Sequence, residues 1–282
     1  MIEGMAERSE ALALPVRRPS TLSRLRRRTG RIILAPLYRV YTDTLRHEVR
    51  QAAVPHHVAV ILDGNRRWAT EAGLHVGVGH RHGADKIDDL LAWCRELGVS
   101  EVTLWALSGE NLDRDEQELE ALLAVVAEKL DHLATQSVRI RVIGRFERLP
   151  AWLLEAIARA ESDTAGNGGL RLNIALGYSG RDELVDACRA MVRTLAARGV
   201  SAEDLAGSVT GEALAANLYT AGGPDPDLII RTSGELRLSG FLPWQSAHSE
   251  FYFTDVYWPA FRELDFLRAL RTYQQRERRY GR

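Results

Sequence analysis

The sequence is poor in cysteine, in lysine and in long apolar runs. Its 282 residues include two cysteines, Cys94 and Cys188, and no CxxC pair, which argues against a disulfide framework or a zinc ribbon. The longest uncharged apolar run, residues 121–127, has seven residues, whereas a membrane-spanning helix needs about eighteen. The chain begins without the pattern of a secretion signal. We therefore expect a cytoplasmic protein that does not span a bilayer.

Two common cofactor motifs are also missing. The sequence has no GxxxxGK[ST] phosphate loop, and the glycines of residues 77–83 neither match the GxGxxG spacing nor follow an expected strand. His80 and His82 have no third ligand nearby in the sequence, so catalytic zinc is not indicated. Neither a nucleotide cofactor nor a nucleic-acid partner is expected.

The composition that remains is that of a soluble globular protein, with 45% hydrophobic and 27% charged residues. Charge is uneven along the chain, because residues 1–50 hold 11 arginines and 5 acids, a net charge of +6, within a total of -1. Residues 1–30 have no apolar period, which predicts a disordered basic leader. Residues 31–54 space Ile33, Leu37, Val40 (or Tyr41) and Leu45 as in an amphipathic helix. Such a helix fits packing against the domain, or peripheral contact with the inner face of an anionic membrane.

From residue 55 to residue 282 the chain alternates short apolar segments with helical patterns. The expected strands are residues 58–62, 101–107, 138–143, 170–176, 228–231 and 250–257. The expected helices are residues 84–97, 113–136, 151–162, 182–197, 214–219 and 265–280. Strands separated by helices form right-handed crossovers and a parallel sheet. The prediction is a single α/β domain with a central, mostly parallel six-stranded sheet flanked by helices.

Ligands of open parallel sheets bind beyond the carboxyl ends of the strands, so the residues that leave each strand are the candidates for a site. The first strand is followed by Asp63-Gly64-Asn65-Arg66-Arg67-Trp68, an acid and a glycine turn before two arginines. The second leads into Ser108-Gly109-Glu110-Asn111, and the fifth ends at Arg231, ahead of Arg237 and Ser239. The sixth begins with Glu250, a second candidate metal carboxylate.

Each of these pieces also has an ordinary explanation. Asp-Gly is common in turns, Ser108 and Asn111 fit a helix cap, Arg231 fits a structural ion pair, and Glu250 fits a solvated strand edge. Four separate segments nevertheless bring carboxylates, hydroxyls and guanidinium groups to one edge of the sheet. Magnesium and a diphosphate together require those groups.

Longer stretches of the chain resemble one protein family. Residues 57–69, HVAVILDGNRRWA, look like the opening signature of the cis-prenyltransferases, the undecaprenyl diphosphate synthase family. Its later blocks are matched by residues 79–84, 108–111, 173–181, 226–235 and 250–259. The resemblance runs from His57 to Arg282 and is nearest to the actinobacterial short-chain members that make (2Z,6E)-farnesyl diphosphate.

The resemblance implies the condensation of isopentenyl diphosphate with an allylic diphosphate, with Mg²⁺ as cofactor and a homodimer as the assembly. It implies catalytic roles for Asp63, Asn111 and His80, and magnesium binding by Asp63 and Glu250. It implies substrate binding by residues of three segments: Gly64, Asn65, Arg66, Arg67, Trp68, Ser108, Glu110, Arg114, Arg231, Arg237 and Ser239. Whether Asn111, His80 or the released diphosphate accepts the proton stays open.

The resemblance also implies an apolar tunnel for the growing chain. Its candidate walls are residues of the second strand and of the long helix: Trp105, Ala106, Leu107, Leu122, Val125 and Val126. Short-chain relatives tend to carry a bulky residue where this chain has Ala106, so a longer-chain polyprenyl product stays an alternative. Arg66, Val76, Leu112 and Ala260 also depart from residues common in the family.

Two other functions fit parts of the sequence. A non-catalytic partner subunit would not need Asp63, Asn111, Arg231 and Glu250, all of which are present. A phosphohydrolase with Asp63 as nucleophile would usually have a second acid two residues later, where this chain has Asn65. Both are weaker explanations than an active prenyltransferase.

Overall fold

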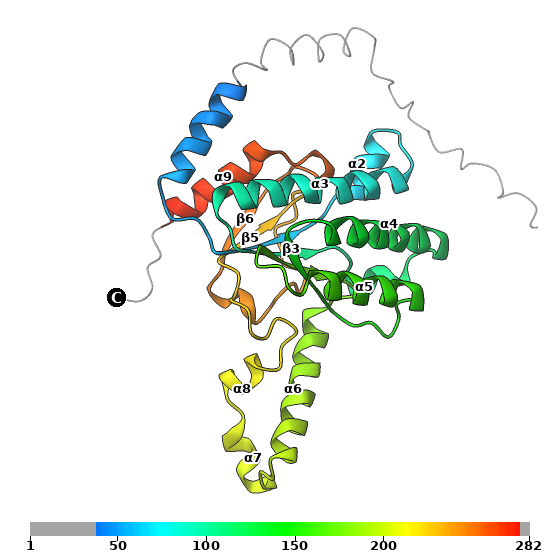
Figure 1. The fold of residues 1–282 in the computed structure, drawn as a ribbon, viewed down its shortest axis with the longest axis vertical. Helices are drawn as coiled ribbons and strands as arrows, with labels where there is room; N and C mark the ends of the chain where they lie inside the picture. The colour runs from blue at the N-terminus through cyan, green and yellow to red at the C-terminus, as the bar shows by residue number, and fades with distance from the viewer. Residues whose placement is uncertain (1–37, 277–282) are drawn as a thin grey trace, which may run out of the picture. The chain divides into compact units, whose positions relative to one another are not determined.

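A central parallel sheet organises the structure. The computed structural model describes residues 38–276. The chain divides into two compact units, residues 1–44 and 45–282, and the sheet lies in the second. The six strands have the order β3-β4-β2-β1-β5-β6, and every neighbouring pair is parallel (Figure 1). The predicted fold class is therefore confirmed.

The strands are β1 (His57–Ile61), β2 (Glu101–Trp105), β3 (Val138–Ile143), β4 (Leu170–Ala175), β5 (Leu228–Arg231) and β6 (Glu250–Phe253). All residues of β1 and β5 are buried, which explains why, apart from His57 and Arg231, both are apolar runs without alternation. Ile61 is in register with Trp105 on one side and with Arg231 on the other. The chain after β1 therefore leaves the sheet beside Arg231, the last residue of β5.

The helices between the strands are α2 (Asn65–Glu71), α3 (Val76–Leu97), α4 (Glu116–Ala134), α5 (Ala151–Thr164) and α6 (Gly180–Ala197), followed by α7 (Ala202–Ser208), α8 (Gly211–Ala215) and α9 (Glu263–Gln275). Three short 3-10 helices join them: η1 (Gly109–Asp113), η2 (Gln245–His248) and η3 (Trp258–Ala260). Helix α4 packs between α3 and α5. In Figure 1, α6 runs away from the sheet, and α7 and α8 return beside it.

Helix α3 is longer than its pattern predicts. It begins at Val76, eight residues before the expected start, and contains Gly77, Gly79 and Gly83. Two of these glycines lie against the start of α2: a Cβ on Gly79 would be 2.3 Å from the Asn65 carbonyl oxygen, and one on Gly83 would be 2.4 Å from Asn65 Oδ1. Close packing of the two helices therefore outweighs the low helix propensity of glycine.

The predicted amphipathic helix is only partly within the described residues. Residues 38–50 are helical, whereas residues 31–37 and the predicted leader, residues 1–30, lie outside them. Within the second unit, Leu45 and Val49 are buried, and Arg46 lies 2.6 Å from Glu263 of α9. Residues 45–50 of this helix thus pack against the rest of the second unit, to which they belong.

Candidate active site

The turn after β1 requires a glycine at position 64. Gly64 has φ 102° and caps the amino end of α2, a backbone conformation that residues with a Cβ seldom adopt. A Cβ at this position would also lie 2.6 Å from Tyr257 Cδ1. The Trp258 amide donates to the Asp63 carbonyl oxygen at 3.0 Å. These contacts fix the direction in which the Asp63 side chain leaves the sheet.

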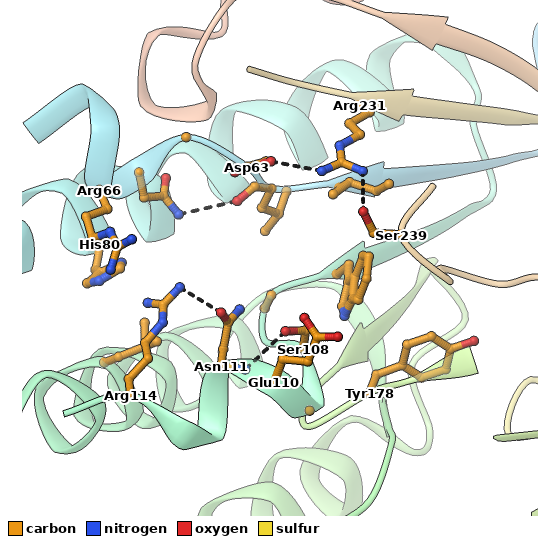
Figure 2. A pocket seen from close by; sticks show the side chains of 18 of the residues that line it. Asp63, Arg66, His80, Ser108, Glu110, Asn111, Arg114, Tyr178, Arg231 and Ser239 are labelled. Carbon is orange, nitrogen blue, oxygen red and sulfur yellow. Dashed lines mark hydrogen bonds and ion pairs between the residues drawn. The ribbon is translucent and has the colours of Figure 1, made fainter. Parts of the chain in front are cut away.

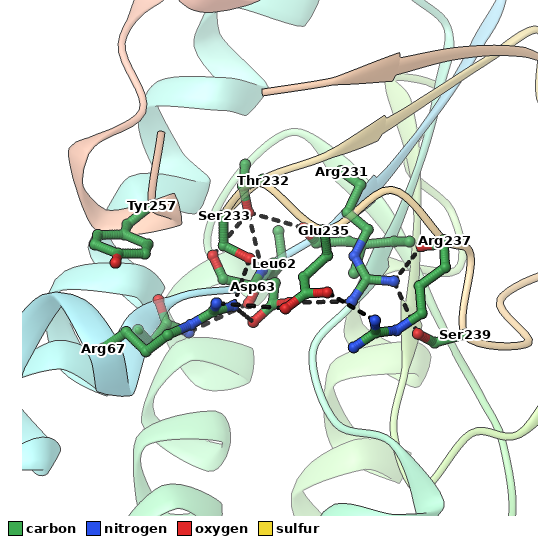
Figure 3. A network of polar contacts seen from close by, with 12 residues as sticks. Leu62, Asp63, Arg67, Arg231, Thr232, Ser233, Glu235, Arg237, Ser239 and Tyr257 are labelled. Atoms are coloured by element: carbon green, nitrogen blue, oxygen red, sulfur yellow. Dashed lines mark hydrogen bonds and ion pairs between the residues drawn. The ribbon is translucent and has the colours of Figure 1, made fainter. Parts of the chain in front are cut away.

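Asp63 lies between two guanidinium groups. Its Oδ1 is 3.2 Å from Arg67 and its Oδ2 is 3.2 Å from Arg231; Figure 3 shows both pairs. Burial opposes ionisation of the carboxyl, but the hydrogen bonds from Ser233 and Arg231 and the charge of Arg67 hold the pKa of Asp63 below its usual value. The side chain is therefore an anion, and 30% of it remains exposed.

Arg231 is held by the loop that follows its own strand. Its Nη1 donates to Ser239 Oγ at 2.8 Å and to the Arg237 carbonyl oxygen. Ser233 and Ser239 have positive φ values of 78° and 53°, which are unusual for residues with a side chain and occur at functional sites. The side chain of Arg231 is 6% exposed. A guanidinium fixed in this way is prepared to bind a planar or multidentate anion.

Arg67 completes the cluster on the side of α2. It donates to Ser233 Oγ at 2.6 Å, lies 3.5 Å from Glu235, and sits 5.7 Å from the centre of the Tyr257 ring. Neither Ser233 nor Tyr257 was among the predicted site residues. The contact to Tyr257 links segments far apart in the sequence, so no local pattern could reveal it.

The opposite side is formed by the segment after β2. Ser108 caps η1 and accepts from the Asn111 amide, as its capping pattern suggested. Asn111 Oδ1 accepts from Arg114 at 2.9 Å, and Arg114 lies 3.1 Å from Glu118. Glu118 was not predicted; Arg114 precedes α4 and Glu118 lies in its first turn, so the pair joins the helix to the segment before it.

His80 of α3 reaches the same place. Its side chain is 5% exposed, and its Nε2 lies 3.7 Å from Glu118, beyond hydrogen-bond length. Burial, together with the charge of Arg114, lowers the pKa of His80 below its usual value. The imidazole is therefore neutral near pH 7, and neither ring nitrogen has a hydrogen-bond partner among the described residues.

These groups surround one cavity of about 720 Å³. Figure 2 shows Asp63, Arg231 and Ser239 across it from Asn111 and Glu110. The cavity is lined by most of the predicted site residues: Asp63, Gly64, Asn65, Arg66, Arg67, His80, Ser108, Glu110, Asn111, Arg114, Arg231, Arg237 and Ser239. Segments from β1, β2, β5 and α3 thus meet at the carboxyl edge of the sheet.

Two predicted residues lie elsewhere. Trp68 does not line the cavity and instead lies beside His82, with ring centres 5.0 Å apart. Glu250 is in register with Leu228, the first residue of β5, and pairs with Arg276. Because a parallel strand begins at the amino edge of the sheet, Glu250 is at the other end from Asp63. The prediction that these two carboxylates share a metal is wrong within a single chain.

An apolar cavity of about 50 Å³ adjoins the first one. It shares five residues with the polar cavity, namely Leu62, Asn65, His80, Ala106 and Leu122. Val125 and Val126 line it as predicted. Trp105 instead lines the polar cavity and stacks on Phe241 with ring centres 5.1 Å apart, whereas Leu107 is buried and lines neither cavity.

The donor set fits magnesium only in part. No group of three or more His, Cys, Asp or Glu side chains that could hold a metal occurs in residues 38–276. Asp63 offers a partly exposed carboxylate between two guanidinium groups at the cavity. Magnesium is commonly held by one or two carboxylates and the phosphates of a substrate, so the site fits a magnesium ion that arrives with a diphosphate.

Comparison with known proteins gives consistent matches. The protein-family model described as "Putative undecaprenyl diphosphate synthase" matches residues 61–281. An isoprenyl transferase of Thermus thermophilus is 49% identical over 253 residues, 88% of this chain and 96% of the relative. A (2Z,6E)-farnesyl diphosphate synthase of Thermobifida fusca is 50% identical over 251 residues, 89% of this chain and 99% of the relative.

A solved structure matches as well. The crystal structure of lavandulyl diphosphate synthase from Lavandula x intermedia, in complex with dimethylallyl diphosphate, has a TM-score of 0.74 and 35% identity. The match covers 80% of this chain and 97% of that one.

Proposed function

This chain belongs to the undecaprenyl diphosphate synthase family of prenyltransferases, and we propose that it joins isopentenyl diphosphate to an allylic diphosphate, geranyl or farnesyl diphosphate, with a Z double bond in the product. The observation that carries the proposal is the cavity in which Asp63 lies between Arg67 and Arg231. Relatives named (2Z,6E)-farnesyl diphosphate synthase support a Z-prenyl diphosphate as the product.

The cavity offers two places for a diphosphate. One lies over Gly64 and the start of α2, where backbone amides are accompanied by Arg66 and Arg67. The other is formed by Arg231, Arg237 and Ser239. Two anions can be held in one cavity because cationic groups face both of them and Asp63 separates Arg67 from Arg231. We assign the first place to the allylic diphosphate and the second to isopentenyl diphosphate.

The reaction requires charge stabilisation on a leaving group. The C–O bond of the allylic substrate breaks, the double bond of isopentenyl diphosphate attacks the allylic carbon, and a proton then leaves the new chain. Arg66 and Arg67 would stabilise the developing charge of the departing diphosphate. Asp63 would hold Mg²⁺, which when bound supplies Lewis-acid stabilisation to phosphate oxygens.

With the two diphosphates placed in this way, Asn111 and His80 would lie beside the reacting carbons. Asn111 is oriented by Arg114, which donates to its Oδ1 and leaves the amide nitrogen available to the cavity. The neutral His80 offers one ring nitrogen as a donor and the other as an acceptor. Both side chains can therefore position a diphosphate, and the acceptor nitrogen of His80 can also receive the proton without a prior change of charge.

The apolar cavity supports a short product. Its volume of about 50 Å³ leaves little space for a growing chain, because close-packed interiors do not expand freely. This restriction favours a short product such as (2Z,6E)-farnesyl diphosphate. The small side chain of Ala106 at the shared wall favours the alternative, a longer polyprenyl diphosphate.

We further propose a homodimer located in the cytoplasm, with the amino-terminal helix available for peripheral membrane contact. No helix within residues 38–276 combines the length and the apolar character that crossing a bilayer requires. Strand β6 forms one edge of the sheet, and an edge strand can pair with or pack on another copy.

Product analysis tests the function. Purified protein with Mg²⁺ is given labelled isopentenyl diphosphate and, in turn, dimethylallyl, geranyl or farnesyl diphosphate, and the products are separated by chromatography. We expect incorporation of label into a Z-prenyl diphosphate with at least one primer. A chain that incorporates no label with any primer would be a partner subunit and not an active synthase.

A further inference from the structure

The wall of the apolar cavity includes a charged side chain. Lys129 of α4 lines this cavity together with apolar residues of α3 and α4 such as Ile87, Val126 and Leu130. Its side chain is 11% exposed, and its Nζ lies 2.7 Å from Asp88 Oδ2 on α3. The apolar stem therefore covers the cavity while the ammonium group is tied to the neighbouring helix.

Lys129 stands away from the diphosphate site. On α4, Leu122 lines both cavities, whereas Lys129, seven residues later, lines only the apolar one. Seven residues of helix correspond to about 10 Å. On α3, His80 lines both cavities and Ile87 only the apolar one. Both helices thus run from the diphosphates toward the Lys129–Asp88 pair.

Asp88 is held by more than one partner. Its Oδ1 accepts from Gln136 Nε2 at 3.0 Å and lies 3.3 Å from His132 Nε2, and both partners belong to the end of α4 or the residues after it. The pair therefore joins α3 and α4 at a half-buried point. The Lys129 side chain is largely buried, although that of Asp88 is 35% exposed, so losing Asp88 would leave a largely buried charge without its partner, which is costly.

We propose that the Lys129–Asp88 ion pair closes the far end of the chain-binding cavity and thereby limits the length of the prenyl product. This inference rests on the proposed function, because it assigns the apolar cavity to the growing chain. A longer chain needs space that becomes available only if α3 and α4 separate or the Lys129 stem moves. Either movement breaks the pair.

A second ion pair on the same two helices provides a control. Arg81 Nη1 lies 2.7 Å from Glu128 Oε2, and both side chains are 61% exposed. Arg81 is seven residues before Asp88, so it lies on the same face of α3, but neither Arg81 nor Glu128 lines the apolar cavity. Exposed pairs contribute little to stability, so this pair should not restrict the cavity.

Two substitutions remove the pair and keep the side-chain volume: Asp88→Asn and Lys129→Met. Lys129→Arg retains the pair, and Arg81→Gln is the control. We expect Asp88→Asn and Lys129→Met to raise the ratio of the next longer product to the wild-type product about tenfold, the discrimination that a small change in an apolar pocket supports. Lys129→Arg and Arg81→Gln should retain the wild-type distribution. Unchanged distributions in both pair-breaking variants would overturn the proposal.

A binding series separates this inference from the proposed reaction. Decyl, pentadecyl and eicosyl diphosphate are unreactive, and their affinities can be measured by calorimetry on folded wild-type and variant proteins. The affinity of the wild type should stop rising at a chain length beyond which Asp88→Asn and Lys129→Met still gain affinity. If the wild type transfers no prenyl group, the reaction is refuted, but this series still decides the role of the pair. If the affinity stopped rising at the same alkyl chain length in the wild type and in both variants, the proposed role of the Lys129–Asp88 pair would be contradicted.

Discussion

At the scale of single residues, the site depends on charges placed so close together that each fixes the others. Asp63 is an anion because Ser233, Arg231 and Arg67 surround it, and Arg231 is held in turn by Ser239. The sequence could predict most of the residues that line this cavity, because a parallel sheet brings the ends of its strands to one edge, but it also placed Trp68 and Glu250 there. It could not predict these individual contacts, which depend on the conformation of the loop after β5.

Replacing the acid tests its role. Asp63→Asn keeps the shape of the side chain and removes its charge, so kcat should fall on the order of a hundredfold or more, the loss typical of a missing electrostatic group. Steady-state kinetics at saturating Mg²⁺ measure this, and thermal unfolding reports whether the fold is kept. The control is Asp113→Asn, an exposed carboxylate paired with Arg148. Near-normal turnover of Asp63→Asn would refute the role.

At the scale of elements, the regular parts of the fold were the predictable ones. The bounds predicted for β3 and β5 agree with the structure, because β3 alternates buried apolar residues with arginines and β5 is a short buried run. The start of α3 was missed because its glycines serve packing against Asn65. Glu250 was placed on the right strand but at the wrong edge, because the first residue of a parallel strand lies opposite the end where ligands gather.

The turn at the start of α2 gives a second prediction. Gly64→Ala adds a Cβ that meets the Tyr257 ring at 2.6 Å, whereas at Gly73, after the same helix, a Cβ has nothing within 4 Å. Both glycines have positive φ, so both substitutions should cost about 1 kcal/mol of unfolding free energy from backbone strain. Gly64→Ala should cost more and also impair catalysis. Chemical denaturation measures the loss of stability and kinetic assays the loss of activity. If Gly64→Ala and Gly73→Ala lost the same stability and the same activity, this explanation would be contradicted.

The buried histidine of β1 predicts a dependence of stability on pH. His57 Nδ1 lies 2.8 Å from the Pro224 carbonyl oxygen and Nε2 lies 2.8 Å from Thr103 Oγ1. Burial lowers the pKa of His57, although Glu101 opposes the shift. Below pH 6.5, the unfolded chain therefore binds more protons than the folded one. The free energy of unfolding should decrease as the pH is lowered, by up to about 1.4 kcal/mol per pH unit for this group.

Denaturant unfolding between pH 7 and pH 5 measures that slope. His57→Asn removes the titrating group, so the free energy of unfolding should decline less steeply with acidity than in the wild type. His80, whose pKa is lowered in the same direction, leaves part of the slope in the variant. Equal slopes in the two proteins would show that His57 does not contribute.

At the scale of the whole molecule, the function comes from segments that are distant in sequence and joined by the strand order. Strands β2, β1 and β5 are neighbours, so three separate loops reach one cavity. Sequence patterns alone could predict this convergence but not the assembly of copies of the chain.

We predict a dimer. Strand β6 is at the sheet edge and carries Phe251 and Phe253, which are half-buried and stacked with ring centres 6.4 Å apart. Burying these rings against a second copy would remove apolar surface from water. Light scattering at assay concentration should give twice the mass of the chain. A monomer at that concentration would refute the predicted assembly.

The central claim is that one cavity binds two diphosphates, one of them through Arg231. It is tested most directly by titrating isopentenyl diphosphate, in the presence of Mg²⁺, onto protein saturated with an unreactive thio analogue of farnesyl diphosphate. The account predicts that the wild type binds both ligands together, and that Arg231→Lys weakens isopentenyl diphosphate roughly tenfold or more, because the two-pronged contact is lost, while the analogue still binds. Displacement of the analogue by isopentenyl diphosphate, or equal weakening of both ligands, would contradict it.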